Sequence, residues 1–259
     1  KSFSPKKVRY LKRKFIKNII KNFAKKYHFL KRIYIFLKVK NKLIPKLEKQ
    51  LLFKNPYFNN QNLINKKILI PIIETSDHYE VHHILGLAKA LELRGAEIVV
   101  LVCDETLPGC ELKSVKNENN NDPCWICRFN LKNVLGIYNF KIIKLNQYID
   151  NKKFLEFKHI AEEFYNNEIE IISNGIKLNQ AINDSIIRYF YGAVPKEKSK
   201  IKKVIIDHTI TSLITSNAID AITKKFKPDI VLNNMIAYST WEPIYKYFIK
   251  NNIEFHTLN

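Results

Sequence analysis

The chain has 259 residues, of which 46% are hydrophobic and four are cysteines. This length suits one large domain, or one domain with an extension. The hydrophobic content excludes a wholly disordered chain, and four cysteines are too few for a mini-protein built on disulfides. The sequence also has no run of ~18 uncharged apolar residues that would span a bilayer as a helix.

The net charge of +20 is confined to the first quarter of the chain. Residues 1–67 contain 21 basic residues and a single acid, Glu48, whereas basic and acidic residues are equal in number over 68–259. A charge step this sharp marks a boundary between units with different partners. We therefore predict a basic extension over 1–54, an Asn-rich linker over 55–66 and a neutral domain over 67–259.

The basic extension has the pattern of an amphipathic helix. Its apolar residues recur in steps of three and four, with lysines on the other faces: Val8, Leu11, Phe15, Ile19, Phe23, Tyr27, Leu30 and Tyr34. Such a helix fits an anionic membrane surface, where each basic residue contributes roughly 1 kcal/mol. We predict that residues 1–54 hold the protein at the cytoplasmic face of the cell membrane, as a peripheral protein.

Two other roles for the basic extension remain open. The helix can pack on its own protein or on a subunit. It can also neutralise nucleic-acid phosphates, although the scarcity of arginine disfavours base readout and makes nucleic acid the less favoured partner.

The neutral domain alternates between short apolar strands and longer helices. Strands are expected at 67–73, 97–103, 140–145, 228–232 and 253–257, and helices at 81–94, 125–137, 152–165, 179–191, 197–226 and 238–250. Gly95 is expected to end the first of these helices as a left-handed cap. The alternation predicts an α/β fold with a Rossmann-like, doubly wound parallel sheet of about five strands.

Ligands of such sheets bind beyond the carboxyl ends of the strands, near the switch in strand order. The loops after the first and fourth strands, 74–83 and 233–238, are therefore the candidate site. Neither GxGxxG nor GxxxxGK[ST] occurs, which disfavours a dinucleotide-binding fingerprint and a P-loop NTPase.

Several segments of the domain resemble GT-B glycosyltransferases. The opening ILIPIIETSDHYEVHHILGLAKALELRGAEIVVLVCD (68–104) looks like the start of a GT-B N-terminal domain. More narrowly, four segments resemble bacterial surface or capsular polysaccharide biosynthesis proteins of this type: CDETLPGCE (103–111), PCWICRFN (123–130), SIIRYFYG (185–192) and the stretch from KPDIVL to the end (227–259).

The resemblance implies the acceptor-side half of an enzyme that transfers a sugar from a nucleotide-sugar to a glycan or lipid-linked acceptor. In GT-B enzymes a second Rossmann-like domain mainly binds the donor, and catalysis generally needs no metal cofactor. We expect that domain to be missing after Asn259 and this chain alone to be inactive. The alternatives are a non-catalytic Rossmann-like module with a nucleic-acid-binding arm, and a GT-B-fold sugar epimerase or hydrolase.

The first loop is rich in polar side chains. We predict that Thr75, Ser76 and Asp77 contact substrate, and that His78 or His82 is the general base, because histidine titrates near neutral pH. The plainer alternative is a capped helix whose histidines bond to nearby loops. A two-histidine metal site lacks an evident third ligand.

The cysteines suggest a structural zinc site. Their spacing is Cys103-x6-Cys110-x13-Cys124-x2-Cys127, and a CxxC pair with two further thiolates suits tetrahedral zinc. Free thiols, disulfides, a redox pair and an iron–sulfur cluster are the alternatives.

The loop after the fourth strand supplies a second set of candidate substrate contacts. They are Asn233, Asn234, Tyr238 and Ser239. Their side chains can equally satisfy the local backbone of the loop.

Overall fold

A computed structural model describes residues 65–75, 78–115 and 123–258. The predicted basic extension, nearly all of the linker, and Ser76 and Asp77 lie outside these residues. Contact clustering separates the chain into Lys1–Asn55 and Pro56–Asn259, and all the described elements belong to the second unit. None of the described helices is long and apolar enough to cross a membrane.

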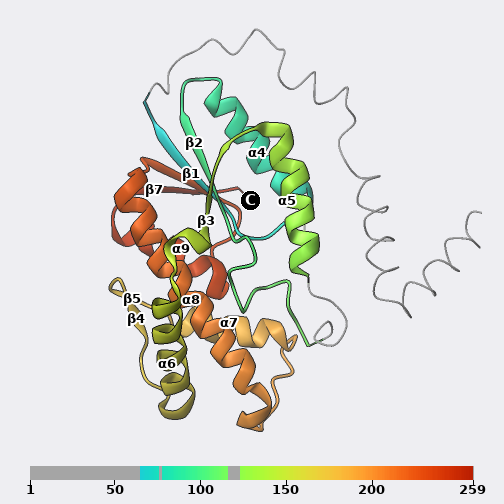
Figure 1. Ribbon diagram of the computed structural model, residues 1–259, viewed down its shortest axis with the longest axis vertical. Helices are drawn as coiled ribbons and strands as arrows, with labels where there is room; N and C mark the ends of the chain where they lie inside the picture. The colour runs from blue at the N-terminus through green and yellow to red at the C-terminus, as the bar shows by residue number, and fades with distance from the viewer. Residues whose placement is uncertain (1–64, 76–77, 116–122, 259) are drawn as a thin grey trace, which may run out of the picture. The chain divides into compact units, whose positions relative to one another are not determined.

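The described unit alternates strands and helices as the sequence predicts (Figure 1). Its elements are β1 (Lys67–Ile72), α4 (His78–Glu92), β2 (Glu97–Val102), α5 (Cys124–Tyr138), β3 (Lys141–Lys144), the 3-10 helix η2 (Leu145–Tyr148), α6 (Asn151–Asn167), β4 (Ile172–Ser173), β5 (Ile176–Lys177), α7 (Asn179–Tyr189), α8 (Lys198–Phe226), β6 (Ile230–Asn233), α9 (Tyr238–Lys250) and β7 (Glu254–Thr257).

The main sheet is parallel throughout and has the order β3-β2-β1-β6-β7. The chain winds outward from β1 to β3, returns, and continues from β6 to β7 in the other direction. Helices α4 and α5 pack together beside the sheet, and α8 and α9 lie across it from them (Figure 1). The fold is therefore Rossmann-like and doubly wound, with its topological switch between β1 and β6.

Burial explains why the central strands read as continuous apolar runs. Residues 68–73 are buried at every position, as are 98–102, because helices cover both faces of the sheet. The larger core joins β1, β2 and β6 to α6, α7, α8 and α9. The edge strands β3 and β7 are mostly exposed.

Pro71 lies inside a central strand, a position where proline is uncommon. It stands in register with Leu101 of β2, but the ladder between β1 and β6 stops at the pair Leu69 and Val231. The missing amide therefore falls where β1 and β6 have already separated, at the switch point that opens the carboxyl edge of the sheet.

Candidate functional site

Among the described residues, several hollows are present, and two of them are considered because they lie where β1, β2 and β6 end. One is a cavity of about 30 Å³ at the ends of β1 and β2, bordered by α5. The other is a groove of about 440 Å³ between α7 and the start of α9, beyond the end of β6. Both therefore lie in the region where doubly wound sheets bind ligands.

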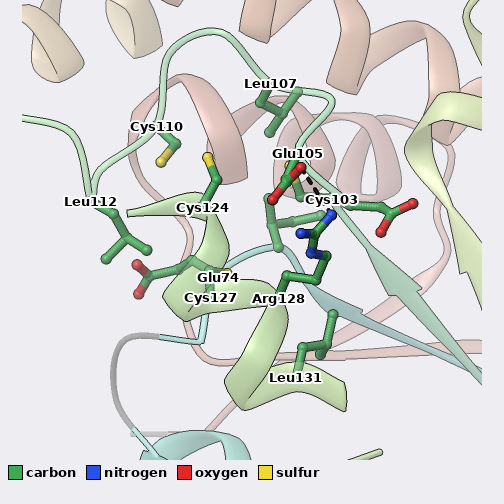
Figure 2. Close-up of a pocket in the computed structure, with 12 residues that line it drawn as sticks. Glu74, Cys103, Glu105, Leu107, Cys110, Leu112, Cys124, Cys127, Arg128 and Leu131 are labelled. Carbon is green, nitrogen blue, oxygen red and sulfur yellow. Dashed lines mark hydrogen bonds and ion pairs between the residues drawn. The ribbon is translucent and has the colours of Figure 1, made fainter. Parts of the chain in front are cut away.

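All four cysteines line the small cavity, which Figure 2 shows in close-up. Cys103 and Cys110 come from the loop after β2, whereas Cys124 and Cys127 belong to the first turn of α5. Burial raises the pKa of the Cys103 and Cys127 thiols, and all four cysteines are free of disulfides. Among the described side chains, no three Cys, His, Asp or Glu converge closely enough to hold a metal ion.

Thr75 anchors the first turn of α5 to the end of β1. Its buried hydroxyl donates to the Cys127 carbonyl at 2.7 Å and lies 3.3 Å from Cys127 Sγ. The Asn130 side chain donates to the Thr75 carbonyl at 3.1 Å. Thr75 thus has a structural role here, and its predicted contact with substrate stays a prediction.

The predicted histidine base lies away from both hollows. His82 Nδ1 is 3.3 Å from the Tyr138 hydroxyl, where α4 packs against α5, and neither residue lines the cavity or the groove. The His78 side chain lies outside the described part of the chain. Their catalytic role stays a prediction.

The groove is lined by one exposed and one half-buried tyrosine, two charged side chains and small or apolar residues. The residues are Asp184, Ile187, Arg188, Tyr191, Gly192, Ala237 and Tyr238. Tyr191 is 52% exposed, and the Arg188 guanidinium carbon lies 5.4 Å from its ring centre. Of the second set of predicted contacts, Tyr238 alone lines this groove.

Backbone strain accompanies the groove. Tyr191 and Tyr238 have φ angles of 53° and 72°, in the left-handed region that costs a side-chain-bearing residue on the order of 1–3 kcal/mol. Such strain persists only where the surroundings enforce it, and it gathers at ligand sites. At Tyr191 the left-handed φ belongs to the turn that ends α7, where the Gly192 amide donates to the Ile187 carbonyl at 2.9 Å.

The other predicted contacts of this loop are satisfied within the protein. Asn233 is buried, donates to the Met235 carbonyl at 2.8 Å and accepts from the Asn234 amide at 2.9 Å. Asn234 Nδ2 donates to Glu80 Oε2 at 3.0 Å. These contacts match the plainer alternative for the two asparagines, and their role toward substrate stays a prediction.

Ser239 belongs to a fully buried polar network that joins three helices. Its amide donates to Ser185 Oγ of α7 at 2.7 Å, and its Oγ lies 2.7 Å from His208 Nδ1 of α8. Burial, followed by the positive charges of Lys113 and Lys203, lowers the pKa of His208 to about 3. The imidazole is therefore neutral, and Ser239 fixes the first turn of α9 instead of facing the groove.

Glu111 is a buried acid that the sequence patterns did not single out. Burial raises its pKa to about 7, although the neighbouring Thr240 opposes this shift. Neither carboxyl oxygen has a hydrogen-bond partner of ordinary geometry among the described residues. Only tertiary folding brings Glu111 beside the start of α9, so local sequence carried no signal of it.

Comparisons with known proteins name no family for this chain. The sequence matches no protein family profile and no curated protein. A CDPS from Fluoribacter dumoffii is similar in structure, with 14% identity, a TM-score of 0.44, and coverage of 78% of this chain and 92% of its own.

A second similar structure is the tyrosyl-tRNA synthetase complexed with L-tyrosine from Archaeoglobus fulgidus. It has 15% identity and a TM-score of 0.38, and the match covers 80% of this chain and 55% of the synthetase. Neither protein is described as a glycosyltransferase, and likeness at this level carries no argument about substrates.

Proposed function

We propose that residues 67–259 are the acceptor-binding domain of a GT-B-type glycosyltransferase that acts in cell-surface polysaccharide assembly. The groove between α7 and α9 is the observation that supports this proposal most directly. Apart from Asp184, which precedes SIIRYFYG by one position, its lining comes from SIIRYFYG and from the C-terminal stretch 227–259, two of the segments that resemble polysaccharide biosynthesis proteins. The resemblance and the hollow thus share six of the seven lining residues.

The groove has the size and chemistry for a sugar acceptor. Its volume of about 440 Å³ lies within the range typical of small-ligand sites. The tyrosine rings offer flat faces to the apolar side of a sugar ring, and Asp184 and Arg188 offer strong charge-assisted hydrogen bonds to hydroxyl groups. Asp184 has no hydrogen-bond or ion-pair partner within the described residues, so its carboxylate is available.

The reaction in this proposal is the displacement of a nucleotide from a nucleotide-sugar by an acceptor hydroxyl. The acceptor oxygen forms the new bond at the anomeric carbon, the nucleotide leaves with its bonding electrons, and a general base takes the hydroxyl proton. A second domain would supply most donor contacts. Transfer needs no metal cofactor in this scheme, and the basic extension would hold the enzyme where lipid-linked acceptors reside.

The test is nucleotide release from a panel of nucleotide-sugars, measured with the full-length protein that carries this chain and with lipid-linked or oligosaccharide acceptors. Release that requires both donor and acceptor supports the proposal. Hydrolysis or epimerisation without transfer, or no turnover of any donor, would overturn it.

The groove is tested in the same assay with Asp184→Asn. Loss of a charged hydrogen bond costs about 1.5–3 kcal/mol, so the KM for the acceptor should rise at least ~10-fold. The KM for the donor should change little. Glu156→Gln, the same acid-to-amide change on the exposed surface of α6, is the matched control and should leave both values unchanged.

A further inference from the structure

A separate groove of about 420 Å³ runs between α5 and the edge strand β3. Its volume lies within the range typical of small-ligand sites. The wall along α5 is one stripe of residues spaced three and four apart, so they share a face of the helix: Arg128, Leu131, Lys132, Leu135, Gly136 and Asn139. None of the residues that line this α5–β3 groove lines the groove between α7 and α9.

Charged and apolar side chains lie toward opposite ends of the α5–β3 groove. Because β2 and β3 are parallel, the intervening α5 runs back along them, and its start meets the end of β3 at the carboxyl edge of the sheet. Arg128 and Lys144 lie toward that edge, and Lys132 follows Arg128 by one turn. The other end of the groove is apolar apart from Asn139.

The charged end suits an anion. It carries three bases against one acid, Asp104. Lys144 pairs with Asp104 at 3.0 Å, and Arg128 pairs with Glu105 at 3.2 Å. Lys132 is exposed and makes no hydrogen bond or ion pair within the part of the chain that the structure describes. Its ammonium group is therefore available to a ligand, in a positive field that its two neighbours reinforce.

The apolar end leaves hydrophobic surface uncovered. Ile142 is 42% exposed, although it lines the groove together with the buried Leu135 and Phe140. Gly136 lies inside α5, where glycine costs about 1 kcal/mol relative to alanine. A Cβ added there would meet no described atom within 4 Å, so no neighbour in the described unit requires this glycine. Its bare backbone instead permits close approach by another molecule.

We propose that the α5–β3 groove binds one anionic amphiphile, a molecule with a phosphate or carboxylate head and an apolar chain. The head binds at Lys132, and the chain lies across Gly136 toward Phe140 and Ile142. Each methylene that the groove buries should tighten binding roughly fourfold. A wholly polar anion would leave the apolar end uncovered, and a neutral lipid would leave Lys132 without a partner.

This proposal is independent of the glycosyltransferase assignment, because its tests measure binding and not sugar transfer. A chain that transfers no sugar can still bind the amphiphile, and an active transferase can fail to bind it.

The first test is calorimetric titration of the full chain with three molecules of one chain length, each below its micelle concentration. They are decyl phosphate, decanoate and decyltrimethylammonium. We expect at least one of the two anions to bind saturably, at least ~10-fold more tightly than the cation, and the tighter anion identifies the head group. No saturable binding of either anion, or equally tight binding of the cation, would overturn the proposal.

The second test locates the bound molecule, because the basic residues 1–67 also attract anions. A decyl phosphate that carries a photoreactive diazirine near the end of its chain is crosslinked to the full chain, and the labelled peptides are identified by mass spectrometry. We expect label within residues 128–144. Label confined to other parts of the chain would contradict the proposal.

The charged end is tested with Lys132→Gln, which should bind the tighter anion at least ~10-fold more weakly, since a hydrogen bond to a charged group is worth about that much or more. Lys152→Gln, the same change on the exposed surface of α6, is the matched control and should bind like the parent protein.

The apolar end is tested with Gly136→Leu. Leucine favours the helix and meets no described neighbour at Cβ, so thermal stability should not fall, whereas the side chain fills the groove and should weaken binding at least ~10-fold. Unchanged binding in either Lys132→Gln or Gly136→Leu would place the ligand elsewhere. Should Gly136→Leu fail to fold, Lys132→Gln and the position of the label decide.

Discussion

His208 is a buried histidine of α8 whose protonation differs between the folded and the unfolded state. Its ring is 2% exposed, and Nδ1 lies 2.7 Å from Ser239 Oγ. The pKa of His208 is lowered to about 3, chiefly by burial, so the folded state keeps the imidazole neutral over most of the acid range. In the unfolded chain the same ring takes up a proton near pH 6.5.

This difference predicts that His208 by itself lowers stability in mild acid. Below pH 6.5 the ring takes up a proton in the unfolded state and not in the folded state, so its contribution to the free energy of unfolding falls as the pH drops toward about 3, by up to ~1.4 kcal/mol per pH unit. Glu111, whose pKa is raised to about 7, contributes in the opposite direction, so the comparison of variants and not the parent alone isolates His208. In urea unfolding at pH 7.5 and 4.5, His208→Asn should lack this contribution, which amounts to up to about 2.7 kcal/mol between the two pH values.

The control for this prediction is His83→Asn on the exposed side of α4. It should reproduce the pH dependence of the parent protein, since it replaces an exposed histidine and leaves the buried His208 in place. If His208→Asn and His83→Asn lose stability in parallel, the buried histidine does not govern the acid sensitivity.

At the scale of elements, the loop after β2 is held closely against α8. The Gly109 amide donates to Thr211 Oγ1 at 2.9 Å, and the Thr211 hydroxyl donates to the Gly109 carbonyl at 2.8 Å. A Cβ at Gly109 would lie 2.9 Å from His208 Nδ1 and 3.0 Å from the backbone of Asp207. The glycine therefore permits a backbone-to-helix contact that no other residue allows.

Gly109→Ala should lower the free energy of unfolding by about 1–3 kcal/mol, because a helix backbone cannot move aside as a flexible side chain would. Gly136→Ala is the matched control, since a Cβ there meets nothing within 4 Å. It lies inside α5 and should raise stability by up to ~1 kcal/mol through helix propensity. Thermal unfolding of both variants measures the contrast, and equal effects would contradict it.

The sequence predicted elements better than it predicted contacts. The helix predicted over 197–226 is α8, which begins one residue later at Lys198, and Gly95, with a φ of 99°, ends α4 as expected. The β4–β5 hairpin was missed because each strand has only two residues, although its Asn174-Gly175 turn is a known hairpin signal. Apolar periodicity needs a longer window than such strands provide.

Side-chain roles were predicted less well, because they depend on what folding brings together. Thr75, Asn233 and Ser239 lie at or beyond the carboxyl ends of β1 and β6, yet all three are buried and hydrogen-bonded inside the protein. Asp184 and Arg188 lie within a helix, and only the packing of α7 against α9 opens a groove beside them. The four cysteines do line one cavity, but no three of the described Cys, His, Asp or Glu side chains could hold a metal ion, so the predicted zinc site stays a prediction.

At the scale of the whole molecule, charge divides the sequence into two parts of different character. The neutral part contains the cavity and the groove, whereas the +20 charge belongs to residues 1–67. A glycosyltransferase that uses lipid-linked acceptors needs its acceptor groove near a membrane surface. The basic extension is the part of the sequence suited to provide that contact.

We predict that the full chain binds vesicles containing anionic lipid and that its affinity falls as salt is added. Replacing Lys12, Lys14, Lys17 and Lys21 by Gln should weaken binding by about 4 kcal/mol, roughly a thousandfold, at about 1 kcal/mol for each charge. Lys158, Lys198, Lys200 and Lys203 lie exposed on the neutral domain, and the same four changes there should have little effect. Flotation of both variants with vesicles measures the difference. Both variants lose four positive charges and differ only in where those charges lie. Equal vesicle binding by the two variants would therefore contradict a membrane role for residues 1–67. Binding of the full chain to DNA without binding to vesicles would contradict it as well.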